Sequence, residues 1–221
     1  MEYYSPDTEF IMKYTKELKL PTVKDSLDDI ITDATAGQWD YRKFLRVLFE
    51  REVEQRIENR KYGRIRKANF PQMKYLQELV REELPADCRN LLPEFETLNF
   101  IREGRNIVMY GNPGTGKTHT AIGLGIKACM DGFTVYFTTV PHLLTQIREA
   151  KTGKTLQQME NRFRKYDLVI CDEMGYVGFD KEGAELLFNM ISTRTGTRAT
   201  IITTNLPFTR WEEVIKDKVL C

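Results

Sequence analysis

The chain has 221 residues, of which 41% are hydrophobic and 29% charged, and its formal net charge is +1. This length can hold one sizeable domain and a smaller one, and the composition is that of a soluble globular protein without low-complexity tracts. The apolar runs are far too short to span a bilayer, and the first residues lack the regions of a signal peptide. The four cysteines form no C-x-x-C pair and no metal-ligand pattern with the two histidines. We therefore expect a cytoplasmic protein with reduced thiols and no membrane partner.

Three helices are predicted at the start of the chain. The first begins near Ser5-Pro6, a cap followed by proline at the first helical position. The second runs from Pro21 to Gly37, and the third begins after Asp40. Apolar residues recur at helical spacing in each of them: Phe10, Ile11, Tyr14 and Leu18; Val23, Leu27, Ile30, Ile31 and Ala34; Phe44, Leu45, Leu48, Val53 and Ile57. The pattern predicts a helical module over residues 1–70, a bundle whose aromatics Trp39, Tyr41 and Phe44 are core residues.

A one-sided basic segment closes this module. Residues 41–75 contain 11 Lys or Arg against 4 Glu, and between Asn59 and Gln77 there are six basic residues and no acidic one. A charge run is usually a solvated helix face, and that interpretation stays open. Because the signs stop alternating after Glu58, a footprint for double-stranded DNA, held through phosphates and weakened by salt, is the second interpretation. The candidate DNA-binding residues are Arg60, Lys61, Arg64, Arg66 and Lys67.

After a connector over residues 71–97, punctuated by Pro85 and Pro93, the pattern changes to alternating strands and helices. The predicted strands are 106–110, 133–139, 167–172 and 199–204, and the predicted helices are 117–131, 141–150, 155–165, 181–194 and 208–217. Short alternation of this kind predicts an α/β fold, a parallel sheet with helices on both faces. A nucleotide should then bind at the carboxyl ends of the strands.

The segment 111–118 fits the pattern G-x-x-x-x-G-K-[ST] at every fixed position, between a predicted strand and a predicted helix. Its glycines let backbone N–H groups converge on phosphates, the helix N-terminus adds a partial positive charge, and Lys117 adds a full one. Thr118 would offer its hydroxyl to Mg²⁺, whereas we expect His119 to pack or form a local hydrogen bond. The candidate nucleotide-binding residues are Gly111, Asn112, Pro113, Gly114, Thr115, Gly116, Lys117, Thr118 and His119.

Polar residues at the ends of two later strands could turn nucleotide binding into hydrolysis. The strand 167–172 ends at Asp172, 55 residues after Lys117, and Glu173 follows it. Asp172 could hold Mg²⁺ through its water shell, and Glu173, buried near the γ-phosphate, could polarise the attacking water. Asn205 could help to place that water, although a side chain satisfying its own turn explains it nearly as well. The candidate catalytic residues are Glu173, Asn205 and Lys117, the candidate metal ligands are Thr118 and Asp172, and Thr203 and Thr204 are weaker candidates for the role of Asn205.

Three stretches, residues 106–120, 171–187 and 200–208, resemble the IstB-like transposition-helper ATPases, relatives of the DnaC-like helicase loaders within the AAA+ class. The likeness begins at about Leu98, and the helical module is similar to that family's DNA-binding segment. The resemblance implies an ATPase that assembles as a homo-oligomer on DNA with ATP and delivers a target site to a transposase. It also implies that Asp172 and Glu173 are the Walker B pair and that Asn205 is the sensor-1 residue.

The chain departs from that family's pattern at Cys221, where members continue into a segment carrying an arginine that reaches a neighbour's γ-phosphate. Arg194, Arg198 and Arg210 remain, and nothing in the sequence assigns this role to one of them. We therefore expect residues 98–221 to be an ATPase core that lacks its C-terminal end and hydrolyses ATP slowly. Two alternatives are a DnaC-like loader that serves a replicative helicase, and a nucleotide-binding adaptor with negligible turnover.

Overall fold

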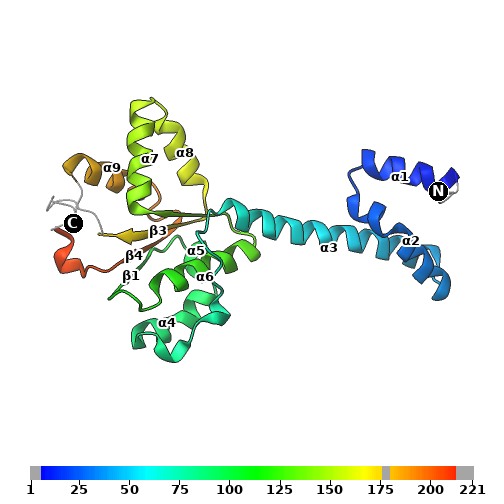
Figure 1. Cartoon of the computed structure of the whole chain (residues 1–221), viewed down its shortest axis with the longest axis horizontal. Coiled ribbons are helices and arrows are strands. Elements are labelled where there is room, and N and C mark those ends of the chain that lie inside the picture. Colours follow the sequence, from blue (N-terminus) through cyan, green and yellow to red (C-terminus); the bar gives the residue numbers. More distant parts are fainter. Residues whose placement is uncertain (1–5, 176–179, 213–221) are drawn as a thin grey trace. The chain divides into compact units, whose positions relative to one another are not determined.

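The computed structural model describes residues 6–175 and 180–212, and its contacts form two compact units, Met1–Arg60 and Lys61–Cys221 (Figure 1). The sequence-based division drew its first boundary after residue 70, so its helical module includes a segment that packs with the second unit. As a division by function, with a connector at 71–97 and an ATPase core from 98, it stays a prediction. No helix among the described residues is long and apolar enough to cross a membrane.

The first unit contains the three predicted helices, and each begins where its cap predicts. They are α1 (Pro6–Glu17), α2 (Pro21–Ala36) and α3 (Tyr41–Lys67), of which the last continues into the second unit. Pro21 lies at the first position of α2, and the Asp40 carboxylate accepts a hydrogen bond of 2.7 Å from the Lys43 amide. Both arrangements stabilise a helix start, because the first amides of a helix have no partner within it.

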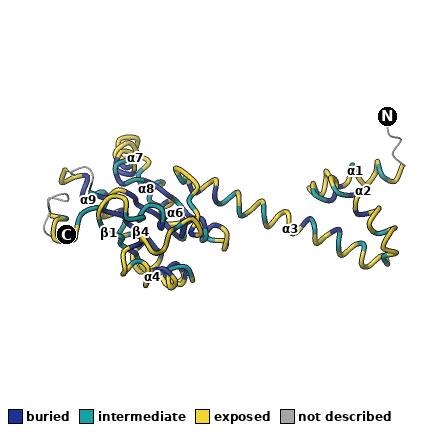
Figure 2. Tube along the Cα trace, turned by 60° about the horizontal axis from the view of Figure 1, so that its bottom comes forward, coloured by how far each residue is buried: buried dark blue, intermediate teal, exposed yellow. Residues whose placement is uncertain are grey.

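The core of the first unit is smaller than predicted. Its packed cluster consists of Val23, Leu27 and Leu48, with Leu20 and Phe44 against it, and the predicted Ile30 is fully buried as well. The predicted core residue Tyr41 is 89% exposed, which contradicts the prediction. Most of the apolar residues that were expected to line helix faces are also exposed (Figure 2): Phe10, Ile11, Tyr14, Leu18, Ile31, Leu45, Val53 and Ile57. Helical spacing aligns side chains on one face, but it does not supply a partner that covers that face.

A buried carboxylate joins two helices of this unit. Glu52 on α3 accepts the amide hydrogens of Thr22 (2.9 Å) and Val23 (3.1 Å) at the start of α2, and pairs with Arg56 at 2.8 Å. Burial by itself would raise the pKa of Glu52, but the Arg56 guanidinium and the two amides outweigh it and hold the pKa below its usual value. Glu52 therefore acts as a long-range N-terminal cap of α2.

The second unit is an α/β fold built on a parallel sheet, as predicted. The described strands are ordered β1-β4-β3-β2, and every neighbouring pair is parallel. Their bounds are β1 Ile107–Tyr110, β2 Val135–Thr139, β3 Leu168–Met174 and β4 Ala199–Thr204. The helices are η1 Leu76–Glu78, η2 Arg81–Glu83, α4 Ala86–Glu96, α5 Asn99–Arg102, α6 Lys117–Met130, α7 Val140–Thr152, α8 Leu156–Lys165, α9 Lys181–Ser192 and η3 Phe208–Arg210.

Helices cover both faces of this sheet, and successive strand residues divide between the two layers (Figure 1). Ile170 and Ile201, paired on neighbouring strands, belong to the cluster that contains α6 and the segments before β1. Val169 and Cys171 belong to the other cluster, which α7, α8 and α9 complete. The sheet is therefore buried on both sides, and polar groups gather at its carboxyl edge.

The predicted helix 208–217 differs from the structure in its first part. Phe208–Arg210 forms one 3-10 turn, and residues 213–217 lie outside the described residues. The other predicted helices and strands of this unit are confirmed within a few residues. β3 continues through Asp172 and Glu173 to Met174, two residues beyond its predicted end, which places both carboxylates inside the strand.

Candidate nucleotide site

The phosphate loop connects β1 to α6 through glycines in left-handed conformations. Gly114 has φ +83° and Gly116 has φ +81°, a region that residues with a side chain rarely adopt. A Cβ atom at Gly116 would also lie 3.0 Å from Leu84 Cδ2. α6 begins at the next residue, Lys117, so its unpaired first amides face the loop. This is the local geometry that anion binding requires.

Lys117 extends back across the loop that precedes it. Its Nζ donates hydrogen bonds of 2.8 Å to the carbonyl oxygens of Gly111 and Asn112. Burial lowers the pKa of Lys117, and the nearby Asp172 carboxylate opposes this shift. The lysine is thus a half-buried cation beside the loop, as the sequence motif predicts.

The predicted magnesium ligands are in contact. Thr118 Oγ1 donates to Asp172 at 2.9 Å (Oδ1) and 3.2 Å (Oδ2), although 54 residues separate them in sequence. A hydroxyl and a carboxylate are hard oxygen donors that suit Mg²⁺, which usually completes its shell with water and phosphate oxygens. No group of three His, Cys, Asp or Glu suited to a metal occurs in residues 6–175 and 180–212. The pair therefore fits a cation shared with a nucleotide and not a cage built by protein alone.

A β-bulge sets the geometry of the two carboxylates. Cys171 pairs with Ile202 and Met174 with Thr204, so Asp172 and Glu173 together face Thr203. Glu173 has φ +63°, which is unusual for a residue with a side chain. As a result Asp172 is buried, at 4% exposure, whereas Glu173 is exposed. The expectation that Glu173 is buried is therefore wrong for this structure.

Thr203 connects both members of the acidic pair, a role that sequence reasoning missed. Its buried Oγ1 donates to Asp172 Oδ1 and accepts the Glu173 amide hydrogen at 3.1 Å. Thr204, the next residue, instead donates to the Met174 carbonyl oxygen at 2.6 Å. The signal that could have found Thr203 is the strand register across from Asp172, which no local pattern contains.

These parts meet in one cavity of about 370 Å³. It combines the phosphate loop, the first turn of α6, Glu173 and the end of β4 with a residue from the segment before α4, Lys74. The lining residues are Lys74, Pro113, Gly114, Thr115, Gly116, Lys117, Thr118, His119, Glu173, Thr203, Thr204 and Asn205. The hydrogen bond of His119 is long-range and not local as expected: its Nε2 lies 2.9 Å from the carbonyl oxygen of Tyr75, in the segment before α4. Backbone anion donors, one lysine on the loop and the Glu173 carboxylate therefore converge on one cavity, with Asp172 joined to it through Thr118, and this cavity can hold a phosphate chain.

The five candidate DNA-binding residues differ in burial and in their contacts within the fold. Arg64 is half-buried, and its Nε donates to the Cys129 carbonyl oxygen at 2.7 Å in the last turn of α6, a stabilising position for a cation. Lys61 is half-buried, whereas Arg60, Arg66 and Lys67 are exposed. DNA contact by these residues stays a prediction. Substitutions at the three exposed residues test it best, because they leave the part-buried contact of Arg64 intact.

Two of the arginines that remained as candidates for a trans role are engaged within the described structure. Arg194 is fully buried, and its guanidinium donates to the carbonyl oxygens of Phe163, Tyr166 and Ala199, the latter two at 2.9 Å. Burial lowers its pKa to about 10, partly offset by nearby anionic groups. Arg198 pairs with Asp167. Arg194 therefore stabilises the packing of α8, β3 and β4, and it cannot reach another subunit.

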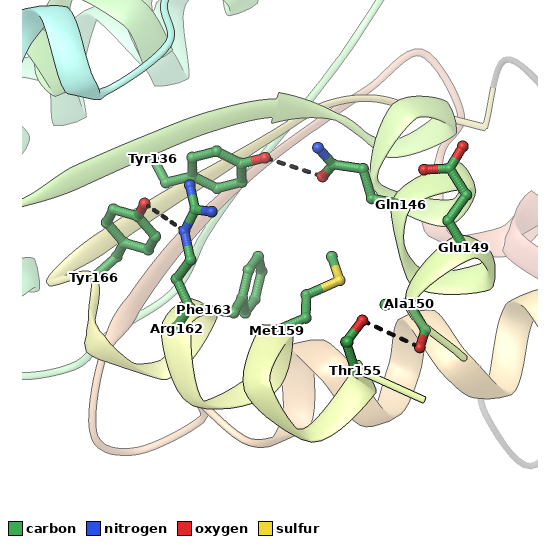
Figure 3. A pocket seen from close by; sticks show the side chains of 9 residues that line it. All are labelled: Tyr136, Gln146, Glu149, Ala150, Thr155, Met159, Arg162, Phe163 and Tyr166. Carbon is green, nitrogen blue, oxygen red and sulfur yellow. Dashed lines mark hydrogen bonds between the residues drawn. The ribbon is translucent and has the colours of Figure 1, made fainter. Parts of the chain in front are cut away.

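A second hollow, of about 340 Å³, lies between β2, α7 and α8 (Figure 3). Tyr136 and Tyr166 stack there with ring centroids 5.1 Å apart, and the Arg162 Nε lies 3.4 Å from the Tyr166 hydroxyl. Its lining contains one carboxylate, Glu149, and no glycine-rich loop. Although Arg162 lines it, this hollow lacks the convergent loop amides that suit a phosphate chain, so the cavity at the phosphate loop is the candidate nucleotide site.

Comparison with known proteins identifies relatives over nearly the whole chain. A family model described as IstB-like ATP binding protein matches residues 13–221. A protein named for ATP binding from the insertion sequence IS232 of Bacillus thuringiensis subsp. berliner is 32% identical over 203 residues, which is 92% of this chain and 81% of the relative. One from IS5376 of Geobacillus stearothermophilus is 32% identical over 212 residues, with 96% and 84% covered.

Solved structures of AAA+ proteins share the fold. The DnaC helicase loader matches with a TM-score of 0.54 at 19% identity, over 71% of this chain and 92% of that one. The replication initiator DnaA bound to AMPPCP and single-stranded DNA matches with a TM-score of 0.57 at 19% identity, over 66% of this chain and 46% of that one. These likenesses concern the fold, which is of the P-loop AAA+ type.

Proposed function

Because the chain belongs to the IstB-like ATP binding protein family, we propose that its nucleotide is ATP with Mg²⁺ and that it hydrolyses this ATP at the cavity beside the phosphate loop. The observation that carries the proposal is the contact of Thr118 on α6 with Asp172 on β3, which brings the acidic pair to the loop. The amides of the loop and Lys117 would bind the phosphates. Thr118 and Asp172 would hold Mg²⁺, which neutralises charge on the β- and γ-phosphates.

Glu173 would act on the attacking water. It is the only carboxylate among the described residues that line the cavity, and it faces that cavity together with Asn205. In the proposed reaction Glu173 orients the water and accepts its proton, while Asn205 fixes the water by a hydrogen bond. Because Glu173 is exposed, a further element that excludes bulk water from the cavity would raise the rate.

The test compares nucleotide binding with turnover. Lys117→Ala should abolish measurable ATP affinity, because it removes the only full positive charge on the loop, and a fluorescence titration measures this. Glu173→Gln should retain ATP affinity and lose most of the ATPase rate, on the order of a hundredfold or more. Unchanged ATP binding in Lys117→Ala would refute the site. An unchanged rate in Glu173→Gln would favour the nucleotide-binding adaptor.

We further propose that the ATP-bound protein assembles on double-stranded DNA and delivers a target site to a transposase. The support is that the relatives named above come from insertion sequences. A helicase-loading role is the second candidate, favoured by the likeness to most of the DnaC loader chain. DNA co-sedimentation with ATP, with ADP and without nucleotide tests the first proposal. Co-purification with a transposase or with a replicative helicase separates the two.

A further inference from the structure

We propose that Lys74 is a second phosphate-binding lysine of this cavity and that it contacts the α-phosphate, which ATP and ADP share. We also infer that the segment Phe70–Glu78, which follows α3, thereby senses whether the cavity is occupied and not which nucleotide occupies it. The inference rests on the proposed nucleotide site and adds to it a residue that no motif contains.

Lys74 is partly withdrawn from water and has no negatively charged partner among the described residues. It is half-buried and lines the same cavity as the phosphate loop residues. Among the described residues, no hydrogen bond or ion pair occupies its ammonium group, in contrast to Lys117, which donates to two carbonyl oxygens. Of the lining residues that the structure describes, Glu173 alone carries a carboxylate, and no ion pair joins it to Lys74. Withdrawing an ammonium group partly from water is unfavourable unless an anion compensates, and phosphate oxygens are the anions that this cavity suits.

The neighbours of Lys74 indicate which end of the phosphate chain it meets. Glu173 and Asn205 lie at the carboxyl ends of β3 and β4, where the γ-phosphate would react. Lys117 reaches the β- and γ-phosphates in loops of this type. Lys74 instead precedes Tyr75, whose carbonyl oxygen accepts a hydrogen bond from His119 in the first turn of α6. It therefore belongs to the part of the lining beside His119, one residue beyond Thr118 on α6, and we assign its phosphate partner there to the α-phosphate.

The segment that carries Lys74 is fixed to α6 by close packing. A Cβ atom at Gly123 would lie 2.7 Å from Leu76 Cδ2, and one at Gly125 would lie 2.9 Å from Phe70 Cε1, so both glycines permit the approach. Just before the segment, the Ala68 carbonyl oxygen accepts the Phe137 amide hydrogen at 2.7 Å. A contact between Lys74 and a phosphate would therefore restrain a continuous stretch that leads from the end of α3 to the cavity.

The experiment measures affinity for fluorescent ATP and ADP analogues in the full chain. Lys74→Met should weaken both nucleotides by a similar factor of about tenfold, and Lys74→Arg should restore affinity to within about threefold of wild type. Lys165→Met, an exposed lysine of α8 outside the cavity, is the matched control and should change neither affinity. In hydrogen exchange, ADP should protect residues 70–78 in the wild type and not in Lys74→Met.

Four outcomes would overturn different parts of the reasoning. Wild-type affinity of Lys74→Met for both nucleotides, with affinity abolished in Lys117→Ala, refutes the role of Lys74 and leaves the proposed function intact. A loss confined to ATP refutes the α-phosphate assignment. A loss that Lys74→Arg does not restore, together with a lower melting temperature without nucleotide, identifies a structural role and refutes the contact. Unchanged binding in Lys117→Ala refutes the proposed function itself.

Discussion

Thr203→Val tests whether the bulge between β3 and β4 aligns the acidic pair for catalysis. Valine has nearly the shape of threonine, so the change removes a hydroxyl and leaves the packing of a buried residue almost intact. The lost hydroxyl donates to the Asp172 carboxylate and accepts the Glu173 amide hydrogen. Asp172 and Glu173 both belong to the proposed catalytic site and keep their carboxylates in this variant. A loss of ATPase rate would therefore report on how Thr203 aligns these two residues.

The expected magnitudes follow from these two hydrogen bonds. A hydrogen bond to a charged group is worth about 1.5–3 kcal/mol, and an unsatisfied amide costs about 1–3 kcal/mol. Glu173 is held at a positive φ, a conformation that costs on the order of 1 kcal/mol or more. Without the Thr203 acceptor its backbone should relax and move its carboxylate. Because a displacement of about 1 Å can reduce a rate roughly a hundredfold, we expect a fall in kcat of about 30- to 100-fold.

The assay measures steady-state ATP hydrolysis, ATP affinity and thermal stability on the same samples. ATP affinity should change by less than about threefold, because the loop and Lys117 stay intact. Thr200→Val is the matched control, since Thr200 lies buried on the same strand, with its hydroxyl 3.4 Å from Arg194 Nε. It should lower stability without lowering the rate per folded molecule. A folded Thr203→Val protein that hydrolyses ATP within about twofold of the wild-type rate would refute the alignment role.

Three further predictions concern stability and DNA. The pKa of Glu52 is lowered in the folded state, so its contribution to stability is present above its unfolded pKa of about 4.3 and is lost as the pH falls through the folded value. Glu52→Gln should remove this pH dependence of stability and speed amide hydrogen exchange at Thr22 and Val23 at neutral pH. Unchanged exchange at these two amides would contradict the capping role. Arg194→Met should destabilise the second unit by about 3 kcal/mol and lower Tm by roughly 6–12 °C, because several buried carbonyl oxygens lose their donor. The control Arg198→Met removes a part-exposed ion pair and should cost at most about 1 kcal/mol of stability. Equal losses of stability in the two variants would count against this explanation. Replacing the exposed Arg60, Arg66 and Lys67 with Gln should reduce the slope of log K for duplex DNA against log salt by roughly 2 to 3 units, whereas an unchanged slope would place DNA contact elsewhere.

Local patterns were sufficient where the physics is local. The phosphate loop is eight consecutive residues, so its glycines, its lysine and the start of the helix that follows are neighbours in the sequence. Strand positions in the second unit followed from short apolar runs, which are typical of a parallel sheet buried on both faces, and helix positions followed from the helical periodicity of apolar residues. The same periodicity failed in the first unit, where the exposed Tyr41 and Leu18 show that an apolar face needs a partner before it becomes a core.

The sequence by itself determined the phosphate loop, the class of fold and the pair Asp172-Glu173. Only the tertiary structure decided that Thr118 meets Asp172, that Thr203 bonds the Asp172 carboxylate and the Glu173 amide, and that Lys74 lines the same cavity as Lys117. The physical reason is that these contacts depend on strand order, register and the packing of a distant segment. Each of them joins residues that lie far apart in the chain, and such pairings are selected by the burial of the whole sheet and leave no periodic signal around any one residue.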